Sequence, residues 1–252
     1  MIIAVANQKG GVGKTTTVVN LGAYLGSKGK RVLIIDADPQ ANATSGLGID
    51  KLKVSKGTYD IIINEVPIKE TIISTDVQGL DIVPSHIDLV AVEMELVSVL
   101  ARESRIKEAV KGELDGYDFV LIDSPPSLGL LTINTMVAAD KILVPIQCEY
   151  YALEGVSQLI NTVKRLRKFL NPNIDIWRIL LTMFDSRTSL SRQVVEEVRD
   201  YFPDKVFKTI IPRSVRLSEA PSFGKPIMHY APDSRGAISY EALAEEVISL
   251  EE

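Results

Sequence analysis

The sequence predicts an α/β fold: a doubly wound, mostly parallel sheet with helices on both faces. Short apolar runs rich in valine and isoleucine recur along the 252 residues. These runs lack the alternation of apolar and polar residues that marks a sheet with one solvated face, so both faces are expected to be covered. Segments with helical apolar spacing separate the runs, and this order of strands and helices favours a parallel sheet.

The predicted elements follow one another along the chain. Seven apolar runs are expected to be strands, at residues 2–6, 31–36, 80–84, 118–123, 141–146, 177–182 and 206–211. Helices are expected at about 15–28, 88–111, 130–139, 153–170, 190–201 and 236–250. Residues 39–80 are interrupted by glycines and a proline, so loops and short helices are expected there. No repeat, low-complexity segment or linker divides the chain, and we expect one domain over residues 1–252 rather than two small ones.

Composition limits the class of protein and its compartment. Cys148 is the only cysteine, which excludes a disulfide framework or a cysteine-ligated metal cluster and indicates a reducing compartment. The first residues enter an apolar strand with neither a basic leader nor a long apolar run, so we expect a soluble cytoplasmic protein without a signal peptide or membrane span. The net charge of -5 argues against a uniformly basic nucleic-acid binder but permits a local basic face.

The segment "NQKGGVGKTT", residues 7–16, has the character of a phosphate-binding loop. It departs from the usual pattern G-x-x-x-x-G-K-[ST], because Gln8 stands where glycine is expected and Lys9 is an additional lysine. Glycines between a strand and a helix let backbone N–H groups approach phosphate oxygens, and the helix N-terminus adds its dipole. An ordinary glycine-rich turn would rarely carry G-K-T-T at this place. We therefore expect a nucleoside triphosphate to be bound by Lys9, Gly10, Gly11, Val12, Gly13, Lys14, Thr15 and Thr16.

Two later apolar runs end in aspartates, at the edge of the sheet where the phosphates are expected. The run "IIDADPQ" contains Asp36 and Asp38, and the run "LIDSPPS" contains Asp123. With Lys14 on the β and γ phosphates and the Thr15 hydroxyl on Mg²⁺, Asp123 is the expected outer-sphere carboxylate of the metal. Asp36 could support the metal's waters and Asp38 could orient the attacking water. Each aspartate alone could also be a helix cap or a solvated loop residue.

Taken together, these motifs resemble the deviant Walker A ATPases, the group of P-loop proteins that contains ParA, MinD and the nitrogenase iron protein. The residues that carry the resemblance are "KGGVGKTT" (9–16), "DADPQ" (36–40) and "DSPPS" (123–127). Essentially the whole chain is similar to the chromosomal ParA proteins, often called Soj, through "QCEYYALEG" (147–155), "LLTMFDSRT" (180–188) and "IPRSVRLSEAPSFGKPI" (211–227).

The resemblance implies a mechanism and answers why a second lysine is present. Lys9 matches the signature lysine of the family, which crosses a two-fold interface to the nucleotide of the partner subunit, so ATP binding would form a homodimer. Lys9, Lys14 and Mg²⁺ would stabilise charge on the phosphoryl oxygens, while Asp38 positions the attacking water. No further catalytic arginine is evident, so slow intrinsic ATP hydrolysis is expected.

The family also places the adenine base against main-chain groups at the ends of strands. The matching segments here are Thr182–Phe184 and Ile211–Arg213. Pro212 and Arg213 are therefore expected at the nucleotide, while Met183 could equally belong to the core.

Three activities compete within this family. An iron protein would need two cysteines in each subunit to bridge an iron–sulfur cluster, and this chain has one. A MinD-like membrane ATPase should end in a basic amphipathic helix, whereas this chain ends in "ALAEEVISLEE", which anionic lipid would repel. Non-specific binding of double-stranded DNA is therefore favoured, and no membrane partner is expected. The expected DNA contacts are Arg187, which matches an arginine that the family uses on DNA, and Lys205, Lys208, Arg216 and Lys225.

Charge along the chain supports this choice without fixing it. Residues 205–225 carry five basic residues against Glu219, a local excess of four positive charges. Each basic residue could instead be solvated surface charge, and Arg213 could serve the nucleotide. The phosphate loop begins within the first ten residues, so we expect no N-terminal helix-turn-helix domain and no sequence-specific operator binding.

The resemblance also implies partners and a place in the cell. A ParB-type centromere-binding protein (Spo0J) would stimulate hydrolysis, and the ATP-bound dimer would be associated with the nucleoid. Segregation of chromosomes or plasmids is the implied role, and control of replication initiation could accompany it. The rival interpretation is a regulatory or assembly protein, in which the nucleotide switch controls a protein partner and DNA binding is incidental.

Overall fold

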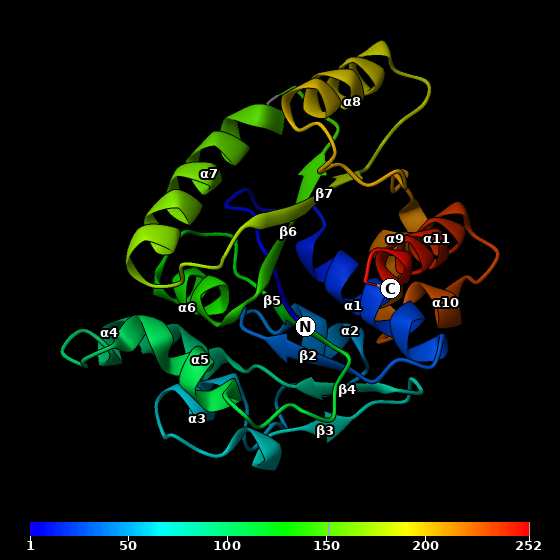
Figure 1. Ribbon diagram of the computed structural model, residues 1–252. Coiled ribbons are helices and arrows are strands. Elements are labelled where there is room, and N and C mark those ends of the chain that lie inside the picture. The colour runs from blue at the N-terminus through cyan, green and yellow to red at the C-terminus, as the bar shows by residue number, and fades with distance from the viewer. Residues whose placement is uncertain (151, 252) are drawn as a thin grey trace.

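A computed structural model describes residues 1–150 and 152–251 and shows one sheet with helices on both faces (Figure 1). Tyr151, in a segment that carries part of the family resemblance, and Glu252 lie outside the described residues. The strands are β1 (Ile2–Val5), β2 (Val32–Asp36), β3 (Ile73–Ser74), β4 (Leu80–Val83), β5 (Phe119–Asp123), β6 (Lys141–Gln147) and β7 (Ile176–Thr182). The α-helices are α1 (Lys14–Ser27), α2 (Asn42–Gly46), α3 (Thr58–Ile62), α4 (Val92–Glu95), α5 (Arg105–Val110), α6 (Leu130–Ala138), α7 (Ala152–Phe169), α8 (Ser189–Tyr201), α9 (Val215–Glu219), α10 (Ile227–Tyr230) and α11 (Arg235–Ser249).

The sheet has the order β3-β4-β2-β5-β1-β6-β7. All neighbouring strands pair in parallel except β3, which pairs antiparallel with β4. From the central β1 the chain therefore winds first towards one edge and later towards the other. The predicted fold class, a doubly wound and mostly parallel sheet, is confirmed.

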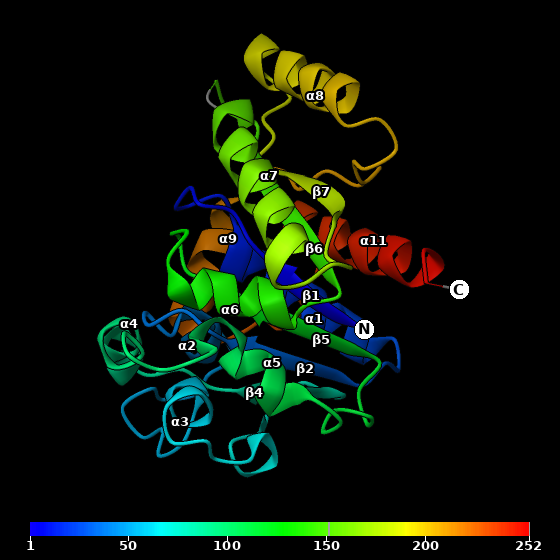
Figure 2. The same cartoon turned by 60° about the vertical axis from the view of Figure 1, so that its left-hand side comes forward.

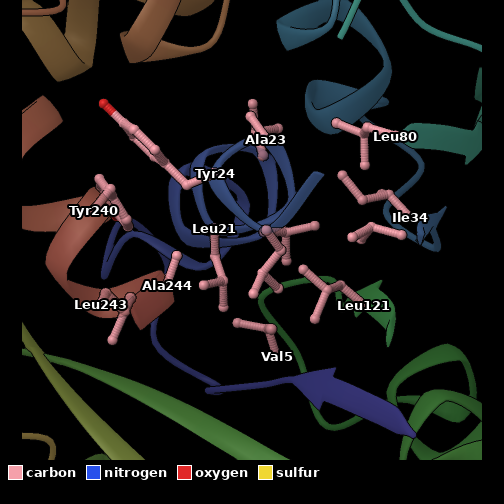
Figure 3. Close-up of a cluster of buried hydrophobic side chains, with 14 of the residues drawn as sticks. Val5, Leu21, Ala23, Tyr24, Ile34, Leu80, Leu121, Tyr240, Leu243 and Ala244 are labelled. Atoms are coloured by element: carbon pink, nitrogen blue, oxygen red, sulfur yellow. The ribbon is translucent and has the colours of Figure 1, made fainter. Parts of the chain in front are cut away.

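Both faces of the sheet are covered, which explains why the strands are apolar at consecutive positions. In β5, Leu121 packs in the cluster beneath α1, whereas Val120 and Ile122 pack in a cluster on the opposite face. Figure 3 shows the first cluster, in which Leu21 of α1 lies between helix and sheet near Val5. Side chains of α11, including Tyr240 and Leu243, close this cluster from the side.

The opposite face is covered by α6 and α7 at one end of the sheet and by α3 and α5 at the other (Figure 2). Val156, Leu159 and Val163 of α7 pack against the outer strands β6 and β7. Ile61 and Ile106 pack against β2 and β5. Within the described residues, no helix is both long and apolar enough to span a membrane.

The predicted strand at 206–211 is wrong. Residues 205–212 run beside β7 and make only isolated bridges, one to the strand, Ile179 with Val206, and one beyond its end, Phe184 with Pro212. The reason is a carboxylate from α11: Glu246 accepts the backbone N–H groups of Lys208 and Thr209, at 2.7 and 2.9 Å. These donors are therefore not available to a regular ladder.

The single helix predicted at 88–111 is also wrong. The chain forms a 3₁₀ turn at Ile87–Ala91, the short α4, a second 3₁₀ turn at Arg102–Ser104, and then α5. Ala101 has a φ of 55°, which interrupts the helical path before α5. The irregular region 39–80 does contain the expected loops and short helices, but β3 was not predicted, because its two exposed residues leave no apolar run.

Candidate nucleotide and metal site

The predicted phosphate and metal residues converge at the carboxyl edge of three neighbouring strands. β5 lies between β1 and β2, and its last residue, Asp123, is in register with Val5 on one side and Asp36 on the other. The chain leaves β1 at this edge and enters the predicted phosphate loop, which leads into α1. Ligands of doubly wound sheets bind at such an edge, so the fold places the motifs where a nucleotide can bind.

The loop between β1 and α1 requires glycine for its backbone conformation. Gly11 and Gly13 have φ values of 72° and 90°, in the left-handed region that side chains disfavour. Gly13 is also the N-cap of α1, and no side chain caps the helix. The first turn of α1 carries no acidic residue, so its free N–H groups and dipole favour a bound anion.

Two neighbouring strands, β6 and β7, anchor the loop through hydrogen bonds that the sequence analysis did not predict. Asn7 donates from Nδ2 to the Pro145 carbonyl in β6, at 2.8 Å, and its Oδ1 accepts the N–H of Lys9, at 3.0 Å. Thr182, at the end of β7, donates its hydroxyl to the Val12 carbonyl at 2.9 Å. Asn7 begins the quoted loop segment, so its contact could have been anticipated, whereas no local pattern connects Thr182 with a residue 170 positions away.

Lys14 is the first residue of α1, and its side chain reaches back to the loop. Its side chain is buried, and Nζ donates to the carbonyl of Lys9 at 3.3 Å. Burial lowers the pKa of the Lys14 ammonium, and the nearby carboxylates Asp123 and Asp38 oppose that shift. A cation held among these groups can act on a phosphate that enters the loop, as the sequence predicts. Lys9 itself is half-buried near the tip of the loop.

Thr15 and Asp123 form the centre of the predicted metal site. The Thr15 hydroxyl donates to Oδ2 of Asp123 at 2.7 Å. Asp123 is fully buried, and among the described residues its Oδ1 has no hydrogen-bond partner. Burial and the neighbouring Asp36 raise the pKa of Asp123 well above its ordinary value. A buried carboxylate oxygen without a partner indicates a missing ligand, here a cation with its waters.

The donor set fits Mg²⁺ rather than a metal held by protein alone. Among the described residues, no group of three or more His, Cys, Asp or Glu side chains could hold a metal ion. Magnesium at phosphate sites usually keeps waters and takes one or two protein oxygens together with substrate phosphates. The hydroxyl of Thr15 and the carboxylate of Asp123 supply such oxygens.

The carboxylate of Asp36 accepts hydrogen bonds from residues that follow it closely in the sequence. Oδ2 accepts the N–H and the hydroxyl of Thr44, at 2.9 and 2.7 Å, and Oδ1 accepts the N–H of Asp38 at 3.2 Å. Burial nevertheless raises the pKa of Asp36 to about 6. The Thr44 hydroxyl also accepts the N–H of Ser85 at 3.0 Å. Asp36 therefore fixes the loop between β2 and α2, a contact that the sequence analysis did not predict.

That loop carries Asp38, the predicted water-positioning residue. Asp38 is buried, and its Oδ1 accepts the N–H of Gln40 at 2.9 Å. Its charge acts on Lys14 and on Asp123, which places it within the same cluster of ionisable groups. The structure thus brings Lys14, Asp38 and Asp123 together, while their individual roles remain predictions.

A cavity of about 250 Å³ adjoins the phosphate loop where the adenine base was predicted. Gly13 and Thr16 line one side, and Thr182, Met183, Pro212 and Arg213 line the other. Two backbone hydrogen bonds join the latter segments: Phe184 N–H to the Ile211 carbonyl at 3.1 Å, and Arg213 N–H to the Phe184 carbonyl at 2.9 Å. Met183 is half-buried in this wall and belongs to no core cluster.

The predicted DNA contacts do not form one basic cluster. Lys205 binds Asp175 at 2.9 Å, just before β7 begins, whereas Arg187 lies beyond the opposite end of β7. Arg187 is held by both carboxylate oxygens of Asp185, at 2.9 and 2.7 Å. Arg216 binds Glu219 at 3.0 Å. The excess of positive charge counted along 205–225 is thus reduced in space by acids from other segments, such as Asp175.

The other two lysines occupy different surroundings. Lys208 lines a surface hollow with Glu246 and Arg178, beside β7. Lys225 lines a cavity of about 380 Å³ with Thr15 and Thr16. It therefore lies next to the phosphate loop and not beside Lys205.

The sequence matches a protein family model and is similar to the sequences of known proteins. Residues 1–176 match the family model described as an AAA domain. The chain is 57% identical over 246 residues to the sporulation initiation inhibitor protein Soj of Bacillus subtilis, covering 98% of this chain and 97% of that protein. It is 51% identical over 247 residues to the chromosome partitioning protein ParA of Myxococcus xanthus, covering 98% of this chain and 87% of that one.

Solved structures of other proteins have the same fold as this chain. Cobyrinic acid a,c-diamide synthase from Mycobacterium smegmatis, with a bound ATP analogue and magnesium, superposes with a TM-score of 0.86 and 37% sequence identity. The match covers 98% of this chain and 93% of that one. MinD from Pyrococcus horikoshii, complexed with Mg-ADP, has a TM-score of 0.81 and 26% identity, with 99% and 96% covered.

Proposed function

The chain belongs to the ParA/Soj family of chromosome-partitioning ATPases, and from this premise we propose that it is an ATP-dependent dimerisation switch that binds DNA and releases it on hydrolysis. The observation that carries the proposal is the juxtaposition of Lys14, Thr15 and Asp123 at the sheet edge, with one buried carboxylate oxygen unpartnered among the described residues. ATP and Mg²⁺ are the ligands that this donor set suits, and structurally similar proteins hold an ATP analogue or ADP with magnesium.

The proposed reaction is in-line attack of water on the γ-phosphorus of ATP. The glycine loop and the N-terminus of α1 bind the phosphates, and Lys14 stabilises the charge that develops on the phosphoryl oxygens. The Thr15 hydroxyl and the Asp123 carboxylate would hold Mg²⁺, and the bound ion would neutralise negative charge on the phosphates. Asp38 orients the attacking water, and the hydrogen bonds of Asp36 hold the loop that carries it. Pro212 and Arg213 line the cavity proposed for the base.

Dimer formation depends, in this proposal, on Lys9. Its backbone is fixed by Asn7 and by Lys14, so the side chain starts from a defined point near the tip of the loop. A cation from each subunit offsets the repulsion between two facing triphosphates, because that repulsion grows as the charges approach. Lys9 would thus make the dimer depend on bound ATP.

The dimer then binds double-stranded DNA without sequence preference through exposed basic residues. Arg187, with 84% of its side chain exposed, and Arg216 are the leading contacts, since Arg187 follows the carboxyl end of β7 and Arg216 lies in α9 between residues that line the cavity beside the phosphate loop. A ParB-type partner accelerates hydrolysis and so ends the DNA-bound state. The proposed site of action is the nucleoid in the cytoplasm, in chromosome or plasmid segregation and in control of replication initiation.

Binding of the Asp38→Ala variant to random-sequence DNA, measured by fluorescence anisotropy with ATP and with ADP at two salt concentrations, tests the proposal. Binding should require ATP and fall steeply with salt, because released counterions drive contact with DNA phosphates. A dimer that forms with ATP but never binds DNA would instead favour the rival function, a nucleotide-switched assembly protein that acts on a protein partner.

A further inference from the structure

A cavity of about 380 Å³ lies between α1, α2 and the 3₁₀ turn Ala220–Phe223, beside the phosphate loop. We call it the α2 cavity. Thr15, whose hydroxyl donates to Asp123, lines the α2 cavity and connects it to the predicted metal site. The cavity proposed for the base is a different one, and the two share Thr16 and Pro221. The α2 cavity therefore begins beside the place expected for Mg²⁺ and is not required for the base.

The lining of the α2 cavity suits an anion. Among the described residues that line it there is no acid, and Lys225 supplies the one charged side chain. The side chains of Lys225, Asn42 and Thr16 have no hydrogen-bond or ion-pair partner in the described part of the chain. An ammonium, an amide and a hydroxyl are therefore available as donors to an oxyanion. Thr16 also belongs to the first turn of α1, where the helix dipole adds to the attraction.

Contacts between distant segments fix the walls of the α2 cavity. In one wall, the buried Asn20 donates from Nδ2 to the Thr16 carbonyl at 2.8 Å, and its Oδ1 accepts the first backbone N–H of α10 at 2.6 Å. In another wall, a Cβ added at Gly224 would meet the Cα of Gly48 at 2.7 Å, so the loop after α2 touches the turn before Lys225. The main chain around the α2 cavity is therefore held in place before any ligand enters.

We propose that the α2 cavity binds the inorganic phosphate that ATP hydrolysis releases, with Lys225 as the charged ligand and Asn42 and Thr16 as neutral donors. The inference rests on the proposed function, because hydrolysis supplies this phosphate. Thr15 lies at the metal end of the cavity, and the exposed Lys225 lies at its solvent end. Phosphate can therefore leave the metal site through the α2 cavity while ADP still occupies the phosphate loop and the base cavity.

Depth distinguishes a free phosphate from the phosphates of DNA. The sequence predicts Lys225 as a DNA contact, and the exposure of its side chain permits one. Thr16, however, is half-buried at the start of α1. A backbone phosphate of a duplex is flanked by sugars and could approach Lys225 without reaching Thr16, whereas a free phosphate can contact both. A cavity with donors along its length therefore fits the smaller ion.

Titration of inorganic phosphate tests the proposal. Sodium phosphate is added to the protein saturated with ADP and Mg²⁺, at an ionic strength held constant with NaCl, and the rise in melting temperature gives an apparent dissociation constant. In Lys225→Ala this constant should be about tenfold higher or more, because a hydrogen bond from a charged donor is lost. Lys168→Ala is the matched control, since Lys168 is exposed and forms no ion pair among the described residues, but lies in α7 on the opposite face of the sheet. Its constant should equal that of the parent.

Loss of a neutral donor gives a second readout. Asn42→Ala should raise the dissociation constant of phosphate by a smaller factor, about threefold, because the amide carries no charge. The affinity for ADP with Mg²⁺, measured with a fluorescent ADP analogue, should be the same in the parent, in Lys225→Ala and in Asn42→Ala. In steady-state hydrolysis, the inhibition constant of phosphate should rise in Lys225→Ala by the same factor as the dissociation constant, while KM for ATP should not change.

The outcomes separate this inference from the function on which it rests. A parent protein that hydrolyses ATP but gains no stability from phosphate, or binds phosphate as tightly as Lys225→Ala does, would overturn the role of the α2 cavity and leave the proposed function intact. Weaker binding of ADP in Lys225→Ala would assign the cavity to the nucleotide instead. Weaker binding of random DNA in that variant, with phosphate binding unchanged, would assign Lys225 to DNA. A parent protein that does not hydrolyse ATP would remove both the inference and the proposed function.

Discussion

The hydroxyl of Thr15 donates to Oδ2 of Asp123 at 2.7 Å, while Oδ1 of the same buried carboxylate has no hydrogen-bond partner among the described residues. This pair joins the start of α1 to the end of β5. An unpaired buried carboxylate is costly, and the cost explains the direction in which the pKa of Asp123 is shifted. A bound cation would remove that cost, so the site is prepared for Mg²⁺ with nucleotide.

Asp123→Asn should separate folding from ligand binding. The neutral amide avoids the desolvation of a carboxylate, so the ligand-free variant should be at least as stable as the parent, despite the weaker acceptor that it offers to Thr15. Its stabilisation by ATP with Mg²⁺ should be lost. Thermal denaturation with and without the ligands checks both statements. A variant that gains the full Mg²⁺-dependent rise in melting temperature would show that Asp123 does not serve the metal.

Asp36 should make the stability of the ligand-free protein depend on pH. Burial raises the folded-state pKa of Asp36 to about 6, above its ordinary value of 3.8. The folded state therefore binds this proton more tightly than the unfolded state, and the free energy of unfolding should fall as pH rises from about 4 to about 6. The expected fall due to this group is on the order of 2 kcal/mol.

Urea denaturation across this pH range, in the Asp123→Asn background, isolates the titration of Asp36 from that of its neighbour. Addition of Asp36→Asn should flatten the curve. An equally steep fall in the double variant would assign the pH dependence to another group.

Gly13→Ala should destabilise the protein even before ligand is added. The φ of 90° at Gly13 lies in the left-handed region, and an alanine there costs about 1–2 kcal/mol. The matched control is Gly10→Ala, since Gly10 has no positive φ and its added Cβ would meet only Pro126, at 3.8 Å. Urea denaturation of the ligand-free proteins should distinguish the two. Equal stability of both variants would contradict the conformation described for the loop.

The sequence predicted those parts of the molecule whose determinants are local. Apolar runs identified six of the seven strands, because a strand buried on both faces is apolar at most consecutive positions. The glycines and Thr15 of the phosphate loop were predicted, since the backbone geometry and the chemistry belong to one short segment. Asp36 and Asp123 followed from the rule that parallel strands end at a common edge.

Contacts between distant segments could not be predicted. The Thr182 hydroxyl that anchors Val12 and the Glu246 carboxylate that interrupts the expected strand at 206–211 come from residues far along the chain. The charge around residues 205–225 could not be predicted from the count alone, because Asp175, which binds Lys205, lies outside that window. Local sequence was therefore more informative about the class of ligand than about the distribution of charge on the surface.

Substitutions of Arg187 and of Asp185 should change the affinity for DNA in opposite directions. Asp185 now neutralises the arginine, and Arg187 lowers the pKa of that carboxyl to about 2. Arg187→Ala should weaken binding to random DNA and reduce its salt slope by about 1. Asp185→Asn should strengthen binding, because it removes a negative charge and releases the guanidinium. Anisotropy titrations with ATP at several salt concentrations measure both effects.

Lys205→Ala serves as the comparison for this pair. Lys205 lies near the start of β7, beside Asp175, and is separated by the length of the strand from Arg187. A loss of affinity as large as that of Arg187→Ala would show that DNA contacts both ends of β7. Unchanged affinity in Arg187→Ala and in Asp185→Asn would exclude this loop from the DNA surface.

The most direct test of the proposed switch is the molar mass of the Asp38→Ala variant in solution, determined by light scattering with ATP and with ADP. A dimer with ATP and a monomer with ADP are expected, and Lys9→Ala added to the same variant should bind ATP yet remain monomeric. A monomer in every nucleotide state, or an ATP-bound dimer that forms equally well without Lys9, would contradict the switch.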